Sequence, residues 1–139
     1  MTGFLLDTNV VSEFRKRQRA DANVKNWLEQ NKGGEFWLSV LVVGELRRGV
    51  ELVSRRDPDS GAALRAWFDS VVKDYGDRIL PVTIEIGERW AMISQQDPVP
   101  VVDGLLAATA IEHDLVLVTR NIADGERTGA RLINPFSPT

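Results

Sequence analysis

The chain has 139 residues, 43% of them hydrophobic, and its 17 lysines and arginines against 20 acids give a net charge of −3. The absence of cysteine excludes disulfides and cysteine-ligated metal centres, and the single histidine is too few for a typical zinc site. The sequence shows no apolar run long enough to span a membrane and no signal-peptide pattern at its start, so we expect one cytoplasmic domain over residues 1–139.

Short apolar runs rich in β-branched and aromatic residues predict five strands. The clearest is Leu115-Val116-Leu117-Val118-Thr119, whose continuous apolar character is typical of a parallel sheet covered on both faces. A proline at position 81 places another predicted strand at a sheet edge or at a strand end. The predicted strands cover residues 4–7, 35–40, 79–82, 115–119 and 130–133.

Helical periodicity in the intervening segments predicts an α/β sandwich. The predicted helices cover residues 10–14, 22–31, 42–55, 62–75, 84–95 and 102–113. Thr8 or Asn9 can cap the first helix, and a turn over residues 57–61 makes helices 42–55 and 62–75 a helical hairpin. The apolar side of this hairpin includes Trp67 and Phe68, which suit either the core or an interface with a partner.

Four acidic residues lie where solvent exposure is not expected. Asp7 ends the first strand, and Glu45 lies in the first turn of helix 42–55, on the same stripe as Gly49. Asp103 begins a helix that is apolar nearly all round, and Asp124 follows soon after the clearest strand.

Each acid also has a purely structural explanation. Asp7 can cap the helix that follows it, Glu45 and Asp103 suit helix N-termini, and Asp124 before a glycine suits a turn. Several carboxylates placed close together, however, repel one another unless a cation is present, and oxygen-only ligands suit Mg²⁺ or Mn²⁺.

Four motifs in this order and spacing, spread over essentially the whole chain, resemble the PIN-domain ribonucleases. Among these the sequence is most similar to the VapC-like toxins of type II toxin–antitoxin systems, in their FitB-type branch. The motifs are Leu5-Leu6-Asp7-Thr8-Asn9, Ser39-Val40-Leu41-Val42-Val43-Gly44-Glu45-Leu46-Arg47-Arg48-Gly49, Asp103-Gly104-Leu105-Leu106-Ala107-Ala108-Thr109-Ala110, and Thr119-Arg120-Asn121 with Asp124.

The resemblance implies an α/β/α sandwich around a parallel sheet, with a metal-dependent nuclease site. Asp7, Glu45 and Asp103 match the three most regular acids of the family, and Asp124 matches its less regular fourth. Gly125 stands where the family often has an aromatic residue, which makes the match at the fourth acid weaker. Supporting polar positions are matched by Thr8, Asn9, Thr119 and Asn121.

The implied reaction is hydrolysis of an RNA phosphodiester. Asp7, Asp103 and Asp124 would hold Mg²⁺ or Mn²⁺ directly or through water, while Glu45 would bind a second ion or orient the attacking water. The resemblance also implies a homodimer and a cognate antitoxin protein as partner. Phosphate contacts are expected from the basic residues near the site, which are Arg15, Lys16, Arg17, Arg47 and Arg48.

Two other classes use similar features. A phosphoacceptor domain of the receiver type also binds Mg²⁺ at clustered acids, but it needs an acid pair near the first strand and a late lysine. Here Asp7 stands alone and Arg120 follows Thr119. The remaining alternative is a PIN module that only binds a partner, against which the full set of four acids argues.

Overall fold

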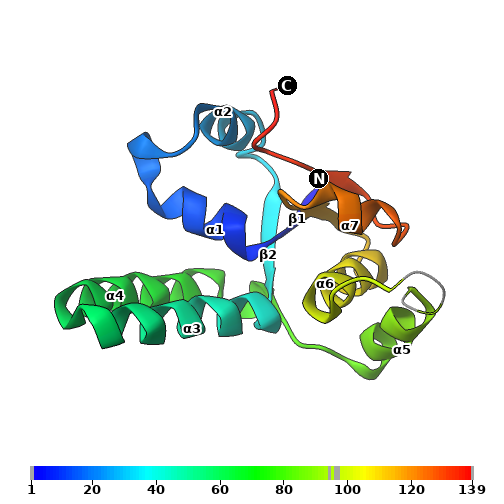
Figure 1. Cartoon of the computed structure of the whole chain (residues 1–139). Helices are drawn as coiled ribbons and strands as arrows, with labels where there is room; N and C mark the ends of the chain where they lie inside the picture. The colour runs from blue at the N-terminus through cyan, green and yellow to red at the C-terminus, as the bar shows by residue number, and fades with distance from the viewer. Residues whose placement is uncertain (1, 94, 96–97, 139) are drawn as a thin grey trace.

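The computed structural model describes residues 2–93, 95 and 98–138, and shows one all-parallel sheet. Its strands follow the order β3-β2-β1-β4-β5 across the sheet, so β1 lies at the centre (Figure 1). The bounds are Gly3–Leu6 for β1, Glu35–Ser39 for β2, Ile79–Leu80 for β3, Val116–Val118 for β4 and Leu132–Ile133 for β5. The five predicted strands are confirmed, and β3 is an edge strand as Pro81 indicates.

The central strands are apolar because both faces of the sheet are covered. Phe4 is 3% exposed and Leu5 and Leu6 are fully buried, and all three residues of β4 are also buried. Phe4 is paired in register with Phe36 of β2 on one side and with Val116 of β4 on the other. A carboxylate directly after such a strand is therefore held in place by a rigid, buried element.

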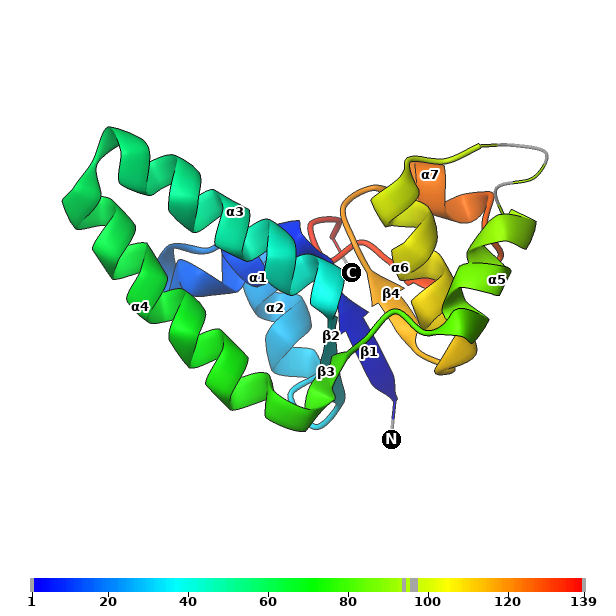
Figure 2. The same cartoon turned by 90° about the horizontal axis from the view of Figure 1, so that it is seen from below.

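Two groups of helices cover the two faces of the sheet. The longer helices are α1 (Thr8–Arg15), α2 (Ala22–Gln30), α3 (Val40–Arg56), α4 (Pro58–Tyr75), α5 (Ile84–Ile93), α6 (Val101–Glu112) and α7 (Ile122–Glu126), with short 3₁₀ turns η1 (Arg17–Arg19) and η2 (Gly76–Arg78). The chain moves from β1 towards β3 and then returns past β1 to β4. Because parallel crossovers are right-handed, helices α1 to α4 pack on one face and α5 to α7 on the other (Figures 1 and 2). Within the described ranges, no helix is long and apolar enough to cross a membrane.

The predicted helical hairpin is confirmed, but its turn is shorter than expected. Asp57 alone separates α3 from α4, and its carboxylate accepts hydrogen bonds from the amides of Asp59 and Ser60 (3.2 and 3.3 Å). Pro58 occupies the first helical position, where its missing N–H costs nothing. The turn predicted over residues 57–61 is therefore wrong, since residues 58–61 are helical.

Other helices also differ from the prediction, most by one or two residues at an end. The first helix begins at Thr8, so its cap is Asp7 and neither Thr8 nor Asn9. No helix is predicted over residues 122–126, but Asn121 caps a short helix there, α7, which contains Asp124. α5 ends at Ile93, whereas the prediction extended to residue 95; Ser94 lies outside the described residues.

Candidate active site

The four acids come from elements that meet at the carboxyl ends of β1 and β4. These neighbouring strands continue into helices on opposite faces of the sheet, since β1 leads into α1 and β4 into α7. Strand order reverses between β1 and β4, and in open α/β sheets ligands bind in the crevice at this switch point. The topology therefore directs attention to Asp7 and Thr119, which directly follow these two strands.

Asp7 is held from two sides. Its amide donates to the Val118 carbonyl (2.9 Å), which extends the pairing of β1 with β4 up to the carboxylate. Its Oδ1 accepts from the Thr8 amide (2.7 Å) and caps α1, and its Oδ2 accepts from the Thr119 hydroxyl (2.7 Å). Thr119 is 3% exposed, and its Oγ1 also accepts from the Asn121 amide (3.0 Å). The orientation of the Asp7 carboxylate is thus set by the two strands together.

Asn121 links the next two acids. Its Nδ2 donates to Oδ2 of Asp103 (3.2 Å) and to Oδ2 of Asp124 (2.8 Å). Its Oδ1 accepts from the Asp124 amide (3.4 Å) as the cap of α7. One amide side chain therefore holds the start of α6 next to α7.

Glu45 reaches the same region from α3. Its Oε1 accepts from the Thr8 hydroxyl (2.5 Å). The Glu45 side chain is exposed, so the expectation that it is shielded from solvent is wrong. A Cβ placed on Gly49 would meet no atom within 4 Å, so the surface beside Glu45 is open, as its helical stripe predicted. Thr8 directly follows Asp7, so this hydrogen bond connects Glu45 on α3 to the end of β1.

The acids influence one another electrostatically. The pKa of Asp103 is raised above its ordinary value of 3.8, first by burial and then by the negative charges of Asp7, Asp124 and Glu45. The hydrogen bond from Asn121 lowers this pKa but does not cancel the increase. All four carboxylates therefore contribute to one local negative field, for which a cation would compensate.

A small cavity of about 10 Å³ lies between Asp7 and Asp103. Thr119 and Asn121 supply further oxygen and amide groups to its wall, and apolar atoms of Leu106 and Leu117 line the rest. This volume is about that of one water-sized sphere, so the space between the two carboxylates admits a water molecule or a single small ion.

The donor set fits a hard divalent cation. Asp7, Asp103, Asp124 and Glu45 offer only oxygen, as Mg²⁺ and Mn²⁺ prefer. In the part of the chain that the structure describes, no three acidic or histidine side chains converge as a ready ligand cluster. Mg²⁺ does not require such a cluster, because it commonly keeps several waters and binds through one or two carboxylates.

Asp124 is already engaged by other groups. Its Oδ1 accepts from Arg127 (2.8 Å) while Asn121 occupies its Oδ2. Sequence reasoning missed Arg127, although its position three residues after Asp124 in a helix was a usable signal. A Cβ on Gly125 would lie 2.8 Å from the Leu132 side chain, so close packing of α7 on β5 explains why no aromatic residue stands there.

The other predicted site residues are only partly brought together. Asn9 is exposed in the first turn of α1, and no hydrogen bond joins its side chain to the four acids within the described ranges. Arg15 and Lys16 line a groove of about 370 Å³ that also contains Thr8 and Glu45.

The remaining predicted phosphate contacts are Arg17, Arg47 and Arg48, which line neither the small cavity nor this groove. Arg17 lines a different pocket beside Lys25. Arg47 pairs with Glu51 (2.8 Å) along α3, and Arg48 is exposed on the same helix.

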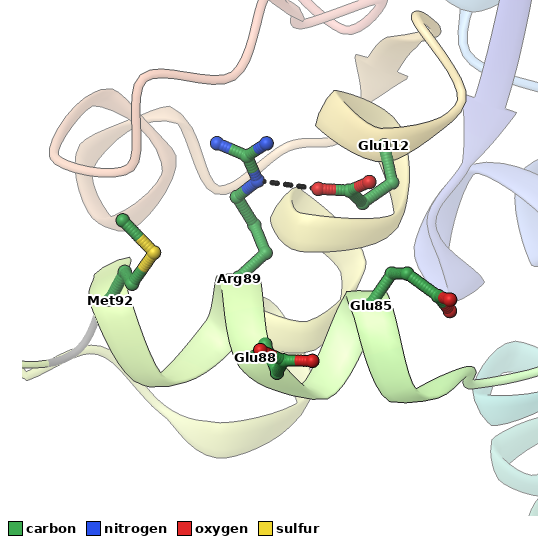
Figure 3. Close-up of a pocket in the computed structure, with 5 residues that line it drawn as sticks. All are labelled: Glu85, Glu88, Arg89, Met92 and Glu112. Atoms are coloured by element: carbon green, nitrogen blue, oxygen red, sulfur yellow. Dashed lines mark hydrogen bonds and ion pairs between the residues drawn. The ribbon is translucent and has the colours of Figure 1, made fainter.

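Another pocket, of about 290 Å³, lies between α5 and α6 (Figure 3). Its wall includes an ion pair of Arg89 with Glu112 (2.7 Å). Glu112 is nine residues beyond Asp103 on α6, a rise of about 13 Å. The pocket is therefore at the opposite end of α6 from the four acids.

Comparison with known proteins shows one family and several relatives of similar length. The PIN domain family model matches residues 4–123. The VapC ribonuclease Y4jK of Sinorhizobium fredii is 28% identical, covering 96% of this chain and 98% of the relative. Toxin FitB of Neisseria gonorrhoeae is 30% identical, covering 95% and 97%. A solved structure of FitAB bound to a DNA fragment superimposes with a TM-score of 0.85 at 27% identity, covering 98% of this chain and 97% of that one.

Proposed function

Because the chain belongs to the PIN-domain family, we propose that it is a divalent-metal-dependent ribonuclease that hydrolyses RNA phosphodiester bonds. The observation that carries this proposal is the small cavity between Asp7 and Asp103 at the switch point of the sheet. Relatives over nearly the full length carry the names VapC ribonuclease and Toxin FitB, which supports the same activity here.

Asp7 and Asp103 are the residues that would hold Mg²⁺ or Mn²⁺, because both face the cavity. When bound, such an ion lowers the pKa of a water nucleophile and offsets charge on the phosphate. Thr119 keeps Asp7 oriented, and Asn121 keeps Asp103 oriented. Glu45 is exposed and accepts a hydrogen bond from Thr8 beside Asp7, where it would orient water. Asp124 would act through water because Arg127 and Asn121 occupy its oxygens.

We further propose that the protein is the cytoplasmic toxin of a toxin–antitoxin pair and forms a homodimer. Toxin FitB is similar along almost the whole chain, and the FitAB structure superimposes closely. A cognate antitoxin would therefore bind this chain and restrain its activity towards RNA.

The test is incubation of the purified protein with total RNA and Mg²⁺, with Asp7→Asn as the control. We expect wild-type protein to cut RNA, EDTA to stop the reaction, and added Mn²⁺ to restore it. Asp7→Asn is expected to fold and to lose cleavage. Cleavage at the wild-type rate by this variant would refute the site, and RNA that stays intact with wild-type protein would favour a module that only binds a partner.

The toxin role needs a separate test in cells. Induced expression of the wild-type chain is expected to arrest growth, whereas Asp7→Asn is not. Mapping the RNA ends that appear after induction identifies the target. Growth arrest by both proteins alike would show that the arrest does not depend on RNA cleavage.

A further inference from the structure

The groove next to the acids, which we call the side groove, runs between α1 and the α3–α4 hairpin. It has a volume of about 370 Å³ and is lined by Thr8, Arg15, Lys16, Glu45, Leu64 and Trp67, among others. Thr8 and Arg15 are seven residues apart on α1, so the groove follows that helix for about 10 Å. Thr8 and Glu45 belong also to the candidate active site, so whatever occupies the side groove lies next to the reacting centre.

The far end of the side groove is positively charged. Lys16 is partly compensated, because it pairs with Glu13 (3.0 Å). Arg15 makes no hydrogen bond or ion pair within the described ranges, and the contact described for it is a cation–π interaction, with its Cζ 5.8 Å from the centroid of the Trp67 ring. Its five N–H donors are therefore free to bind an anion.

The wall opposite α1 is apolar and aromatic. Leu64 and Trp67 lie three residues apart on α4, which places them on one face of the helix. Both side chains are half-buried, so each keeps part of its surface open to the groove. A cationic end, an aromatic wall and a position next to the acids form one continuous surface.

We propose that the side groove binds the nucleotide adjacent to the scissile phosphate of the RNA strand. Arg15 and Lys16 hold the phosphate of this nucleotide, and Trp67 stacks on its base. This proposal rests on the proposed ribonuclease function and adds the position of the substrate strand. Stacking on an aromatic ring accepts every base, so this contact supplies affinity with little sequence preference.

The charges favour a nucleic acid over a segment of a partner protein as the occupant. An unpaired arginine at the cationic end suits a phosphate, and the volume is in the range for small-ligand pockets, about 300–1,000 Å³. The groove also reaches the acids, because Thr8 donates a hydrogen bond to Glu45. An RNA strand that passes over the reacting centre requires such a continuous surface.

Binding and cleavage are measured separately. Binding uses fluorescence anisotropy of a labelled 12-nucleotide single-stranded RNA of random sequence, with Asp7→Asn as the inactive background. Trp67→Leu is expected to weaken binding by about 5- to 150-fold, the effect of losing one stacked base. Trp67→Phe keeps a stacking ring and is expected to stay within about threefold of the background protein.

Salt dependence distinguishes the two kinds of contact. Arg15→Gln is expected to lower the slope of log affinity against log salt by about 0.7, the value for one lost phosphate contact on a single strand. Trp67→Leu is expected to leave that slope unchanged. The matched control is Arg55→Gln, which removes the same charge from an exposed position at the end of α3 and is expected to leave the affinity unchanged.

In the cleavage-competent protein, Trp67→Leu is expected to raise KM about tenfold while kcat stays within about twofold, because the residue contacts substrate away from the reacting atoms. RNA affinity and salt slope that are unchanged in both Trp67→Leu and Arg15→Gln would overturn this proposal, even if wild-type protein cuts RNA. The ribonuclease function is tested independently: wild-type protein that does not cut RNA would refute that function.

Discussion

At the scale of single residues, Asp103 carries the clearest electrostatic signature. Its pKa is raised by burial and by three neighbouring carboxylates, so its ionised form is disfavoured in the folded protein without a metal. Ionisation of Asp103 therefore lowers the free energy of unfolding. This loss of stability is absent below the unfolded pKa near 3.8, grows as the pH rises through the folded pKa, and stays constant above it.

Asp103→Asn is therefore expected to lose RNA cleavage by more than about 100-fold and to gain thermal stability. The gain should be present in EDTA at pH 7 and absent below about pH 3.8, where the wild-type carboxyl is also neutral. Thermal melts across pH measure it. Asp74→Asn, an exposed carboxyl on α4, is the control, and an Asp103 variant that melts below wild type at pH 7 would contradict the prediction.

Thr119 positions Asp7, and its replacement tests that role. Thr119→Val keeps the shape of the side chain but removes the donor to Asp7 and the acceptor for the Asn121 amide. We expect kcat/KM for RNA cleavage to fall about 10- to 100-fold, as for other groups that orient metal ligands. Thr119→Ser restores the hydroxyl and should recover most of the activity; equal loss in both variants would argue for a packing effect alone.

Glu13 is a buried acid that sequence reasoning did not identify. Its carboxylate accepts from the Asp21 amide (2.8 Å) and pairs with Lys16 (3.0 Å). These contacts, the Asp21 amide most of all, lower its pKa below the ordinary 4.5. A lowered pKa stabilises the fold above pH 4.5, and that stabilisation is lost as the pH falls through the folded pKa.

We expect Glu13→Gln to lower the free energy of unfolding by about 1–3 kcal/mol at neutral pH, since a hydrogen-bonded charge is lost. Urea unfolding at pH 7 and at pH 3 measures the effect, which should shrink at the lower pH. A difference that is the same at both pH values would show that the charge of Glu13 is not responsible.

At the scale of elements, the α3–α4 hairpin depends on a close approach at one glycine. A Cβ on Gly61 would lie 2.6 Å from the Ser54 Cα, which is backbone and cannot move without separating the helices. Gly61→Ala is therefore expected to destabilise the protein, because overpacking costs about 1–3 kcal/mol and outweighs the usual helix gain of about 0.5–1 kcal/mol. Chemical unfolding of the variant measures the change.

Gly87 is the matched control for this prediction. It lies inside α5, and a Cβ there would meet no atom within 4 Å. Gly87→Ala is therefore expected to stabilise the protein by about 0.5–1 kcal/mol. Destabilisation of similar size in both variants would remove the special role of Gly61.

The elements with the strongest sequence signal are the long or strongly apolar ones. The central strands and α3 to α6 have clear periods or buried runs. α7 was not predicted because five residues give too little periodicity, and because Asn121 caps it through a single side-chain contact. The start of α4 was missed because Asp57 and Pro58, typical turn residues, are also a typical helix cap and first position.

At the scale of the whole molecule, exposed apolar side chains on α5 and at the start of α6 support the proposed homodimer. Ile84 is 78%, Met92 71% and Val101 58% exposed. Ile84→Glu is expected to convert the dimer to a monomer, because a buried carboxylate without a partner is costly. Light scattering at micromolar concentration measures the mass, with Leu52→Glu on α3 as the control; a wild-type monomer would refute the dimer.

The sequence by itself determined the order of strands and helices, and it located four acids at strand ends and helix starts. It also limited the metal chemistry to oxygen ligands, because the composition shows no cysteine and a single histidine. Only the tertiary structure decided which acids are neighbours. The bond between Asp7 and Thr119 spans 112 residues and the bond between Asn121 and Asp103 spans 18, so both depend on the strand order β1-β4 and on helix packing. Periodicity reports only local conformation, which is why the side groove, whose lining comes from α1, α3 and α4, emerged from the folded chain alone.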